Sequence, residues 1–203
     1  MYPVGVDVSA AQLRVAETLQ REIGPEFPLI LANAEEVPYD HSSFDVAISE
    51  YGASTWCNPS VWLQEARRLL RPDGKLIFFT HSAFLTACTP ADGSPPSTRL
   101  ERSYFSEGAT EFGGESGVEF HATHGEWLAM LRSRGFVIEG LIETRPTEAV
   151  EPRYQLASSK WASQWPSEEI WVARLVSSDA DDWEGRGLPR AELGGANTPT
   201  TPD

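Results

Sequence analysis

Residues 43–79 read SFDVAISEYGASTWCNPSVWLQEARRLLRPDGKLIFF, and this stretch decides the fold class. It predicts a strand over residues 44–49, a helix that begins at Asn58-Pro59, and a second strand over residues 75–80. Asn is a favoured helix N-cap, Pro is a favoured first helical residue, and Arg71-Pro72-Asp73-Gly74 has the composition of a turn. A strand, a helix and a strand in this order predict a parallel βαβ unit.

The same alternation continues on both sides of this stretch. Residues 4–8 and 28–32 are short apolar runs typical of buried strands, and a helix with the capping box Ser9/Gln12 separates them. Later, the capping box Thr123/Glu126 begins another helix, and two further strands are expected over residues 136–142 and 169–176. The sequence therefore predicts an α/β fold with a mostly parallel sheet covered by helices on both faces.

The domain organisation follows from composition. Residues 1–176 read as one domain. Within it, residues 87–117 are rich in Pro and Gly. This composition predicts either a lid or substrate-binding segment or a plain insertion. Residues 177–203 are acidic and polar and contain little that can be buried, so we expect a disordered tail.

Charge and composition narrow the class of partner. The 203-residue chain has a formal net charge of −14, which disfavours nucleic acid and favours a small-molecule substrate. It has no apolar run long enough to span a membrane and no signal peptide at its start. The two cysteines, Cys57 and Cys88, are too few for a disulfide framework. We therefore expect a cytoplasmic protein with two reduced thiols; its oligomeric state is not set by the sequence.

Polar residues follow the first two strands at positions where open α/β sheets bind ligands. Asp7 ends the first strand, and a carboxylate there can accept both hydroxyls of a ribose or serve only as a helix or turn cap. Asn33-Ala34-Glu35 follows the second strand. The Asn33 side chain and the Ala34 amide suit the edge of a purine; the alternative is a turn in which Asn33 bonds to its own backbone.

Taken together, these features resemble the central section of class I S-adenosylmethionine-dependent methyltransferases. That family has an acid after its second strand, an Asp-Ala-Glu-like triplet after its third, and an entry to its fourth like Ser43-Phe44-Asp45. The segment from Leu63 to Gly74 resembles the family's helix and Pro-Gly-Gly turn, with Asp73 in place of the first Gly. Asn33 likewise replaces the usual Asp. The resemblance covers residues 4–82 and extends more weakly to Leu175.

The resemblance implies a Rossmann-like methyltransferase sheet, mostly parallel with an antiparallel last strand, and S-adenosyl-L-methionine as cofactor. It implies that Asp7 binds the cofactor ribose with Val8 beside the adenine. Asn33 and Ala34 would hold the adenine edge, and Ser49 and Glu50 would face the methionine part. Methyl transfer would be in line, with most of the rate from positioning and desolvation.

One departure from the family concerns the start of the sequence. The family's first strand and glycine-rich loop precede its second strand, but here only Met1-Tyr2-Pro3 precedes Val4. We therefore expect an N-terminally truncated sheet with exposed strand edges. Three explanations remain open: a truncated start, a segment supplied by another chain, or a chain that no longer methylates.

The catalytic residue is unknown from the sequence, and His81 is the one candidate. It follows the fifth family strand, where a substrate contact, a general base or a structural hydrogen bond are all possible. His121 and His124 have helical spacing but no patterned third ligand, so no metal is expected. Two alternatives remain: a nicotinamide-dependent oxidoreductase, which Asp7 would serve equally well, and a non-catalytic binding module.

Overall fold

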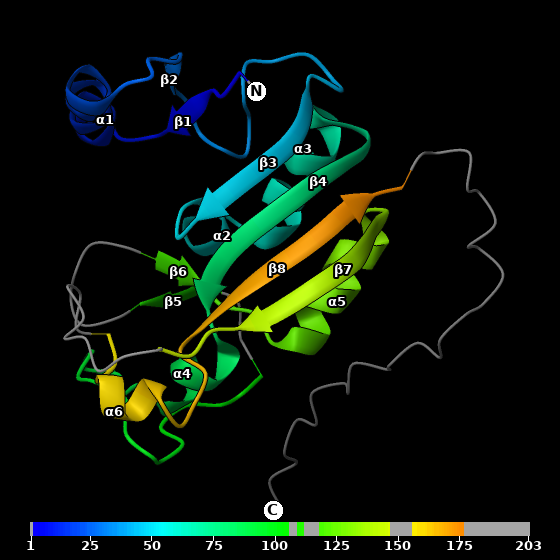
Figure 1. Cartoon of the computed structure of the whole chain (residues 1–203). Helices are drawn as coiled ribbons and strands as arrows, with labels where there is room; N and C mark the ends of the chain where they lie inside the picture. Colours follow the sequence, from blue (N-terminus) through cyan, green and yellow to red (C-terminus); the bar gives the residue numbers. More distant parts are fainter. Residues whose placement is uncertain (1, 106–108, 112–117, 147–155, 177–203) are drawn as a thin grey trace, which may run out of the picture.

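The structure is a computed structural model that describes residues 2–105, 109–111, 118–146 and 156–176. Its central sheet has four strands in the order β3-β4-β8-β7 (Figure 1). The strands are β3 (Phe44–Glu50), β4 (Leu70–His81), β7 (Phe136–Glu143) and β8 (Glu168–Leu175). β3 and β4 are parallel, while β8 is antiparallel to both β4 and β7. This confirms the expected parallel pair and the antiparallel last strand.

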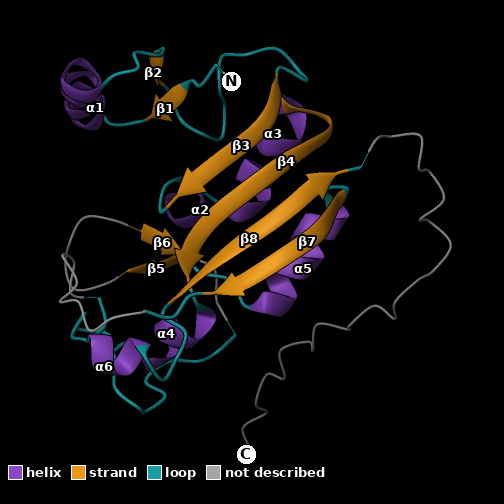
Figure 2. Ribbon diagram, in the orientation of Figure 1, coloured by secondary structure: helices purple, strands orange, loops and turns teal. Residues whose placement is uncertain are grey.

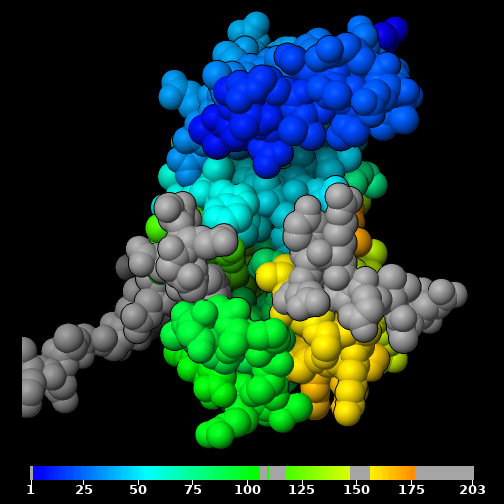
Figure 3. Space-filling view, turned by 90° about the vertical axis from the view of Figure 1, so that its left-hand side faces the viewer, coloured from blue at the N-terminus to red at the C-terminus, as the bar shows by residue number. Residues whose placement is uncertain are grey.

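A second, two-stranded sheet contains β1 (Gly5–Asp7) and β2 (Leu29–Leu31), which are parallel and joined by α1 (Ala10–Ile23). No strand of the described residues pairs β1 or β2 with β3, so each sheet keeps an unpaired edge. Figure 3 shows this N-terminal part, in blue, as a lobe at one end of the molecule. The exposed strand edges expected from the sequence are therefore present.

Two helices cover one face of the central sheet, as Figure 2 shows: α3 (Pro59–Leu69) and α5 (His124–Ser133). Trp62 and Leu63 of α3 and Trp127 of α5 pack against Phe78 and Trp171 of the sheet. Phe78 and Trp171 are fully buried and stack with ring centroids 6.0 Å apart. The hydrophobic core of the protein lies between this face of the sheet and the two helices.

The opposite face differs from the prediction that helices would cover both sides. Ile48, Ile77 and Val172 lie in register across β3, β4 and β8. Ile48 is nevertheless 72% exposed, and Ile77 and Val172 are only half-buried. α1, the helix expected to help cover this face, packs on β1 and β2 and buries none of its own residues. Because α1 stays with the smaller sheet, the second face of the larger one is left partly open.

The expected turn at Arg71-Pro72-Asp73-Gly74 lies within β4 as an irregularity in its pairing with β3. Asp73 has a positive φ of 64°. A Cβ on Gly74 would approach the carbonyl oxygen of Arg71 to 2.8 Å, so a larger residue would force the backbone to shift. The chain turns where the composition predicts, but β4 resumes its pairing with β3 at Lys75.

Short elements complete the fold. Three of them were not expected from the sequence: α2 (Ala53–Trp56), α4 (Ala83–Cys88), and the hairpin of β5 (Ala109–Glu111) with β6 (Val118–Phe120). α6 (Ser159–Ala162) occupies the expected helical turn. α4 and the hairpin lie in or beside residues 87–117, the segment expected to be a lid, a substrate-binding segment or an insertion. The expected tail, residues 177–203, lies outside the described residues. No helix of the described part is long and apolar enough to cross a membrane.

Candidate functional site

The carboxyl ends of the parallel strands carry most of the predicted site residues. β1 ends at Asp7, which is in register with Leu31, the last residue of β2. β3 ends at Glu50 and β4 at His81. Ligands of open α/β sheets bind beyond the carboxyl ends of the strands. Each strand pair thus presents its candidate residues at the expected end.

Asp7 acts as a turn cap in the structure. One of its carboxylate oxygens, Oδ1, accepts a hydrogen bond of 2.7 Å from the amide of Ser9. Its carbonyl oxygen accepts a hydrogen bond of 3.1 Å from the amide of Ala32. The second bond ties the end of β1 to the residue just before Asn33. Capping occupies only part of the carboxylate, because an ionised carboxylate has about four acceptor positions.

Asn33 forms the turn that the sequence left open as an alternative. Its Oδ1 accepts a hydrogen bond of 3.0 Å from the amide of Glu35, and the thiol of Cys57 donates to it across 3.8 Å. Glu35 in turn accepts a hydrogen bond of 2.7 Å from the amide of Asn58. These contacts hold the loop after β2 against the start of α3. Ala34 packs against the main core.

The two candidates at the end of β3 differ in accessibility. Ser49 is buried, and its hydroxyl accepts a hydrogen bond of 3.1 Å from the amide of Ser54 and contacts the Ser54 hydroxyl at the same distance. The Ser49 hydroxyl therefore belongs to an internal network that fixes the β3–α2 loop. Glu50 is exposed, and so is Val8 at the end of β1.

His81 lies in a buried polar cluster at the end of β4. Its ring lies 4.8 Å from that of Tyr51 and 6.1 Å from that of His121, measured between centroids. Its Nδ1 is 3.9 Å from a carboxylate oxygen of Glu119. Burial lowers the pKa of His81 to about 4, despite the opposing charge of Glu119, so the imidazole is neutral at pH 7. The cluster borders a cavity of about 110 Å³, which Thr86, Thr89 and Ser94 also line.

Three of these neighbours were missed by sequence reasoning. The hydroxyl of Tyr51 donates a hydrogen bond of 2.6 Å to Glu168, and the pKa of Tyr51 is raised by burial and by this carboxylate. Glu119 is only 19% exposed and has a lowered pKa: burial raises it, but the hydrogen bond and charge of His121 outweigh that effect. Tyr51, Glu119 and Glu168 are far apart in the chain, so no motif links them.

His124, in the first turn of α5, has a side chain that is 35% exposed and contacts a buried carboxylate. Its Nε2 contacts Glu169 Oε2 at 2.6 Å, and the indole of Trp171 donates to Oε1 of the same carboxylate at 3.1 Å. Glu169 is fully buried, and burial raises its pKa. His124 thus partners a core carboxylate, whereas His121 faces the other way, toward Glu119 and His81.

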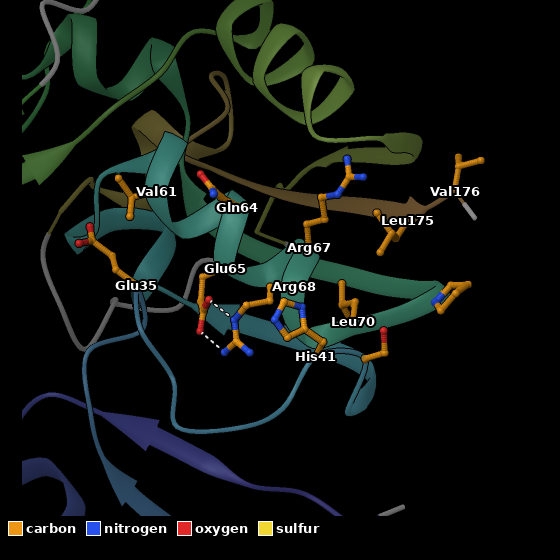
Figure 4. A pocket seen from close by; sticks show the side chains of 12 residues that line it. Glu35, His41, Val61, Gln64, Glu65, Arg67, Arg68, Leu70, Leu175 and Val176 are labelled. Atoms are coloured by element: carbon orange, nitrogen blue, oxygen red, sulfur yellow. Dashed lines mark hydrogen bonds and ion pairs between the residues drawn. The ribbon is translucent and has the colours of Figure 1, made fainter. Parts of the chain in front are cut away.

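A larger hollow, of about 530 Å³, lies beside α3 and reaches Glu35 in the loop after β2 (Figure 4). It is lined by Leu70 at the start of β4 and Leu175 at the end of antiparallel β8, which place it at the amino ends of the parallel strands. Its centre holds the ion pair of Glu65 and Arg68, whose guanidinium also donates to the carbonyl of Tyr39. These contacts fasten a loop to α3, and the hollow is not where the fold binds ligands.

The fold and its carboxyl edge define an α/β protein of the Rossmann-like, ligand-binding class. The sequence profile described as "Methyltransferase domain" matches residues 2–78. A S-adenosylmethionine-dependent methyltransferase from Mesorhizobium loti has 25% identity and a TM-score of 0.65, covering 85% of this chain and 80% of that one. Residues 2–78 thus match the methyltransferase domain family, and the fold of this chain is similar to that of S-adenosylmethionine-dependent methyltransferases, which use S-adenosylmethionine as cofactor.

Other relatives match over shorter segments. The ubiquinone/menaquinone biosynthesis C-methyltransferase of Syntrophotalea carbinolica is 30% identical over 140 residues, which is 66% of this chain and 57% of that protein. An uncharacterized protein of Methanocaldococcus jannaschii is 39% identical over 75 residues, or 37% of this chain and 28% of that protein. The chain thus spans less than two thirds of either relative. These matches favour methyl transfer over the nicotinamide-dependent alternative.

Proposed function

We propose that this chain binds S-adenosylmethionine at the carboxyl ends of β1, β2 and β3 and transfers its methyl group to a small-molecule acceptor. One observation carries the proposal. The ends of β1 and β2 are joined by the hydrogen bond from the Ala32 amide to the Asp7 carbonyl, so Asp7 and Asn33 lie on neighbouring strand ends. A ribose and its attached purine require two such neighbouring groups.

The proposed roles use hydrogen-bonding positions and apolar surface that the contacts within the chain leave available. The Asp7 carboxylate, capped on one oxygen by Ser9, retains acceptor positions for the ribose hydroxyls. Exposed Val8 offers an apolar contact to the adenine face. The Asn33 side chain and Ala34 amide would bond to the adenine edge, with Asn33 kept in place by its turn with Glu35.

The methionine part of the cofactor would face the end of β3. Because the Ser49 hydroxyl is engaged with Ser54, we assign the direct polar contact to exposed Glu50, whose carboxylate suits the ammonium of methionine. Ser49 then positions the loop. This assignment refines the expectation that both residues face the cofactor directly.

The acceptor would lie toward His81, at the end of the adjacent strand β4. In the transfer, the acceptor's electron pair forms the new bond to the methyl carbon while the carbon–sulfur bond breaks and its electron pair remains on sulfur. With a pKa of about 4, His81 is a weak base at pH 7, so we assign it to orienting the acceptor rather than to removing a proton. The net charge of −14 favours an uncharged acceptor over a phosphorylated one.

Calorimetric titration with S-adenosylmethionine tests the cofactor site through Asp7→Asn. Asn can still accept a hydrogen bond from the Ser9 amide, so the turn is retained while the negative charge that faces the ribose hydroxyls is lost. Hydrogen bonds to charged groups are worth about 1.5–3 kcal/mol, which predicts a loss of roughly ten- to a hundredfold in affinity.

Asp45→Asn is the matched control, because Asp45 lies near the start of β3, is 79% exposed, and forms its only ion pair among the described residues with Arg71. It should leave the affinity unchanged. Equal affinity in wild type and Asp7→Asn would remove Asp7 from the site. A reduced nicotinamide dinucleotide that binds more tightly than S-adenosylmethionine in the same titration would favour the oxidoreductase instead.

A further inference from the structure

Two histidines and a glutamate meet at the end of β4, and none of the roles above uses them as a set. His81 is the last residue of β4, Glu119 lies in β6, and His121 follows β6. One ligand-type atom from each side chain lies within 4.8 Å of the others. We call these three residues the His81 cluster.

The cluster is buried, and one of its nitrogens lacks a partner. The side chains of His81 and His121 are 10% and 7% exposed, and that of Glu119 is 19% exposed. Nε2 of His81 is buried without a hydrogen-bond partner among the described residues. Buried polar atoms almost always have a partner, so an unpartnered nitrogen on a buried imidazole needs an explanation.

The two ring nitrogens of His121 have different partners. Its Nδ1 lies 3.2 Å from the hydroxyl of Thr86, which itself donates to the carbonyl of Ser82 across 3.3 Å. Its Nε2 lies 3.1 Å from Glu119 Oε2 and donates a hydrogen bond to it when protonated. A metal ion that displaces this proton would be bound by the same two atoms.

The donor set suits a transition metal. Imidazoles with one carboxylate are typical ligands of Zn²⁺ and similar ions, whereas Mg²⁺ and Ca²⁺ prefer all-oxygen sites. A ligating His typically donates a hydrogen bond from its other ring nitrogen to a nearby oxygen, here that of the Thr86 hydroxyl. Ligands bound at about 2.1 Å in tetrahedral geometry lie roughly 3.4 Å apart, so atoms within 4.8 Å of one another must close by at most about 1.4 Å.

We propose that the His81 cluster binds a divalent transition metal ion of the Zn²⁺ type. Three protein ligands leave at least one coordination position open, as in catalytic rather than structural zinc sites. The adjoining cavity of about 110 Å³, lined by Thr86, Thr89 and Ser94, has room for a water or an acceptor oxygen at that position. The metal site does not depend on the proposed cofactor site, which uses other residues.

The test uses the full-length, untagged chain, stripped with a chelator and titrated with Zn²⁺ by calorimetry. We expect one equivalent to bind. Glu119→Gln and His121→Gln should each weaken binding by roughly 100-fold or more, since losing even a residue that only hydrogen-bonds to a metal ligand costs about 10–100-fold. His41→Gln is the matched control, because His41 is exposed and lies on the larger hollow.

A second readout protects the test against loss of folding. Titration with Co²⁺ should give visible absorption bands of a low-symmetry site in wild type and in His41→Gln, and none in Glu119→Gln. Far-ultraviolet circular dichroism of the metal-free variants should match wild type. Zn²⁺ binding at less than one equivalent would overturn the proposal. Binding that survives in both folded cluster variants would also overturn it, and so would loss of binding in Cys57→Ser, in which the cluster is intact. Because no cofactor is added, failure here leaves the proposed methyl transfer untouched.

Discussion

Glu65 connects α3 to the loop that precedes β3, and it does so with a nearly buried charge. Its carboxylate, 9% exposed, lies 2.7 Å from Arg68 Nη2 and accepts a hydrogen bond of 2.7 Å from the Val37 amide. The Arg68 hydrogen bond lowers the pKa of Glu65 against the opposing effect of burial. The folded state therefore stabilises the ionised carboxylate.

This stabilisation should depend on pH. Because the pKa of Glu65 is lower in the folded state, its contribution is present above the ordinary glutamate pKa of about 4.3 and is lost as the pH falls through the folded value. Glu65→Gln should lower the free energy of unfolding at pH 7 by about 1.5–3 kcal/mol, and the difference from wild type should shrink toward pH 3. Urea unfolding at several pH values measures it.

Asp45→Asn again provides the control, because its ion pair with Arg71 is exposed on both sides. Exposed pairs contribute at most about 1 kcal/mol, so this variant should unfold close to wild type at every pH. A Glu65→Gln deficit that stays constant between pH 7 and pH 3 would mean that packing, and not the charge, accounts for the effect.

At the scale of elements, α5 shows how a cap fixes a helix to the core. The Thr123 hydroxyl accepts from the Glu126 amide at 3.2 Å, and Glu126 accepts from the Thr123 amide at 2.7 Å. The helix then places Trp127 and Leu131 in the core with almost no exposure. On α1, the Ser9 hydroxyl accepts from the Gln12 amide across 3.4 Å, and the helix buries no residue.

Thr123→Ala should therefore destabilise the protein by about 1 kcal/mol, within the range of 0.5–2 for lost N-caps. Ser9→Ala, the matched change on α1, should hardly change global unfolding, because the helix that it loosens contributes little to the core. Chemical denaturation followed by tryptophan fluorescence reports on the core directly. Equal losses in the two variants would contradict the separation between α1 and the core.

The predictability of these elements follows from how local their signals are. Caps such as Ser9, Asn58 and Thr123 and the apolar runs of β3 and β4 act over a few residues, and the corresponding helices and strands were found where expected. α4 and the β5–β6 hairpin are short, and no repeated apolar pattern marks them. What positions Glu119 beside His81 is the packing of that hairpin, which no local pattern encodes.

The candidate site was predictable to a different extent. The resemblance located Asp7 and Asn33, and the structure places both at strand ends, yet it also shows each one capping its own turn. Their binding roles thus remain predictions. Ser49 was expected to face the cofactor, but its burial with Ser54 depends on α2, which the sequence did not reveal.

At the scale of the whole molecule, the division into two sheets leaves apolar surface exposed. β3 is an edge strand of the central sheet, and within the described residues no strand or helix covers its Ile48, which is 72% exposed. Half-buried Ile77 and Val172 continue the same row inward. Unpaired edges with apolar residues beside them are the usual route to pairing between chains. The protein should therefore self-associate through this region at high concentration.

Ile48→Lys tests this expectation, because a charge on an edge strand opposes pairing between chains and an exposed position tolerates it without loss of core packing. Sedimentation velocity over a range of concentrations should show less association than in wild type. Leu100→Lys is the matched control: Leu100 is equally exposed at 72% but lies outside every helix and strand of the structure. It adds the same charge, so a similar reduction in both variants would mean that net charge governs association and not the β3 edge. A wild-type chain that stays monomeric at every concentration would show that this surface does not drive association.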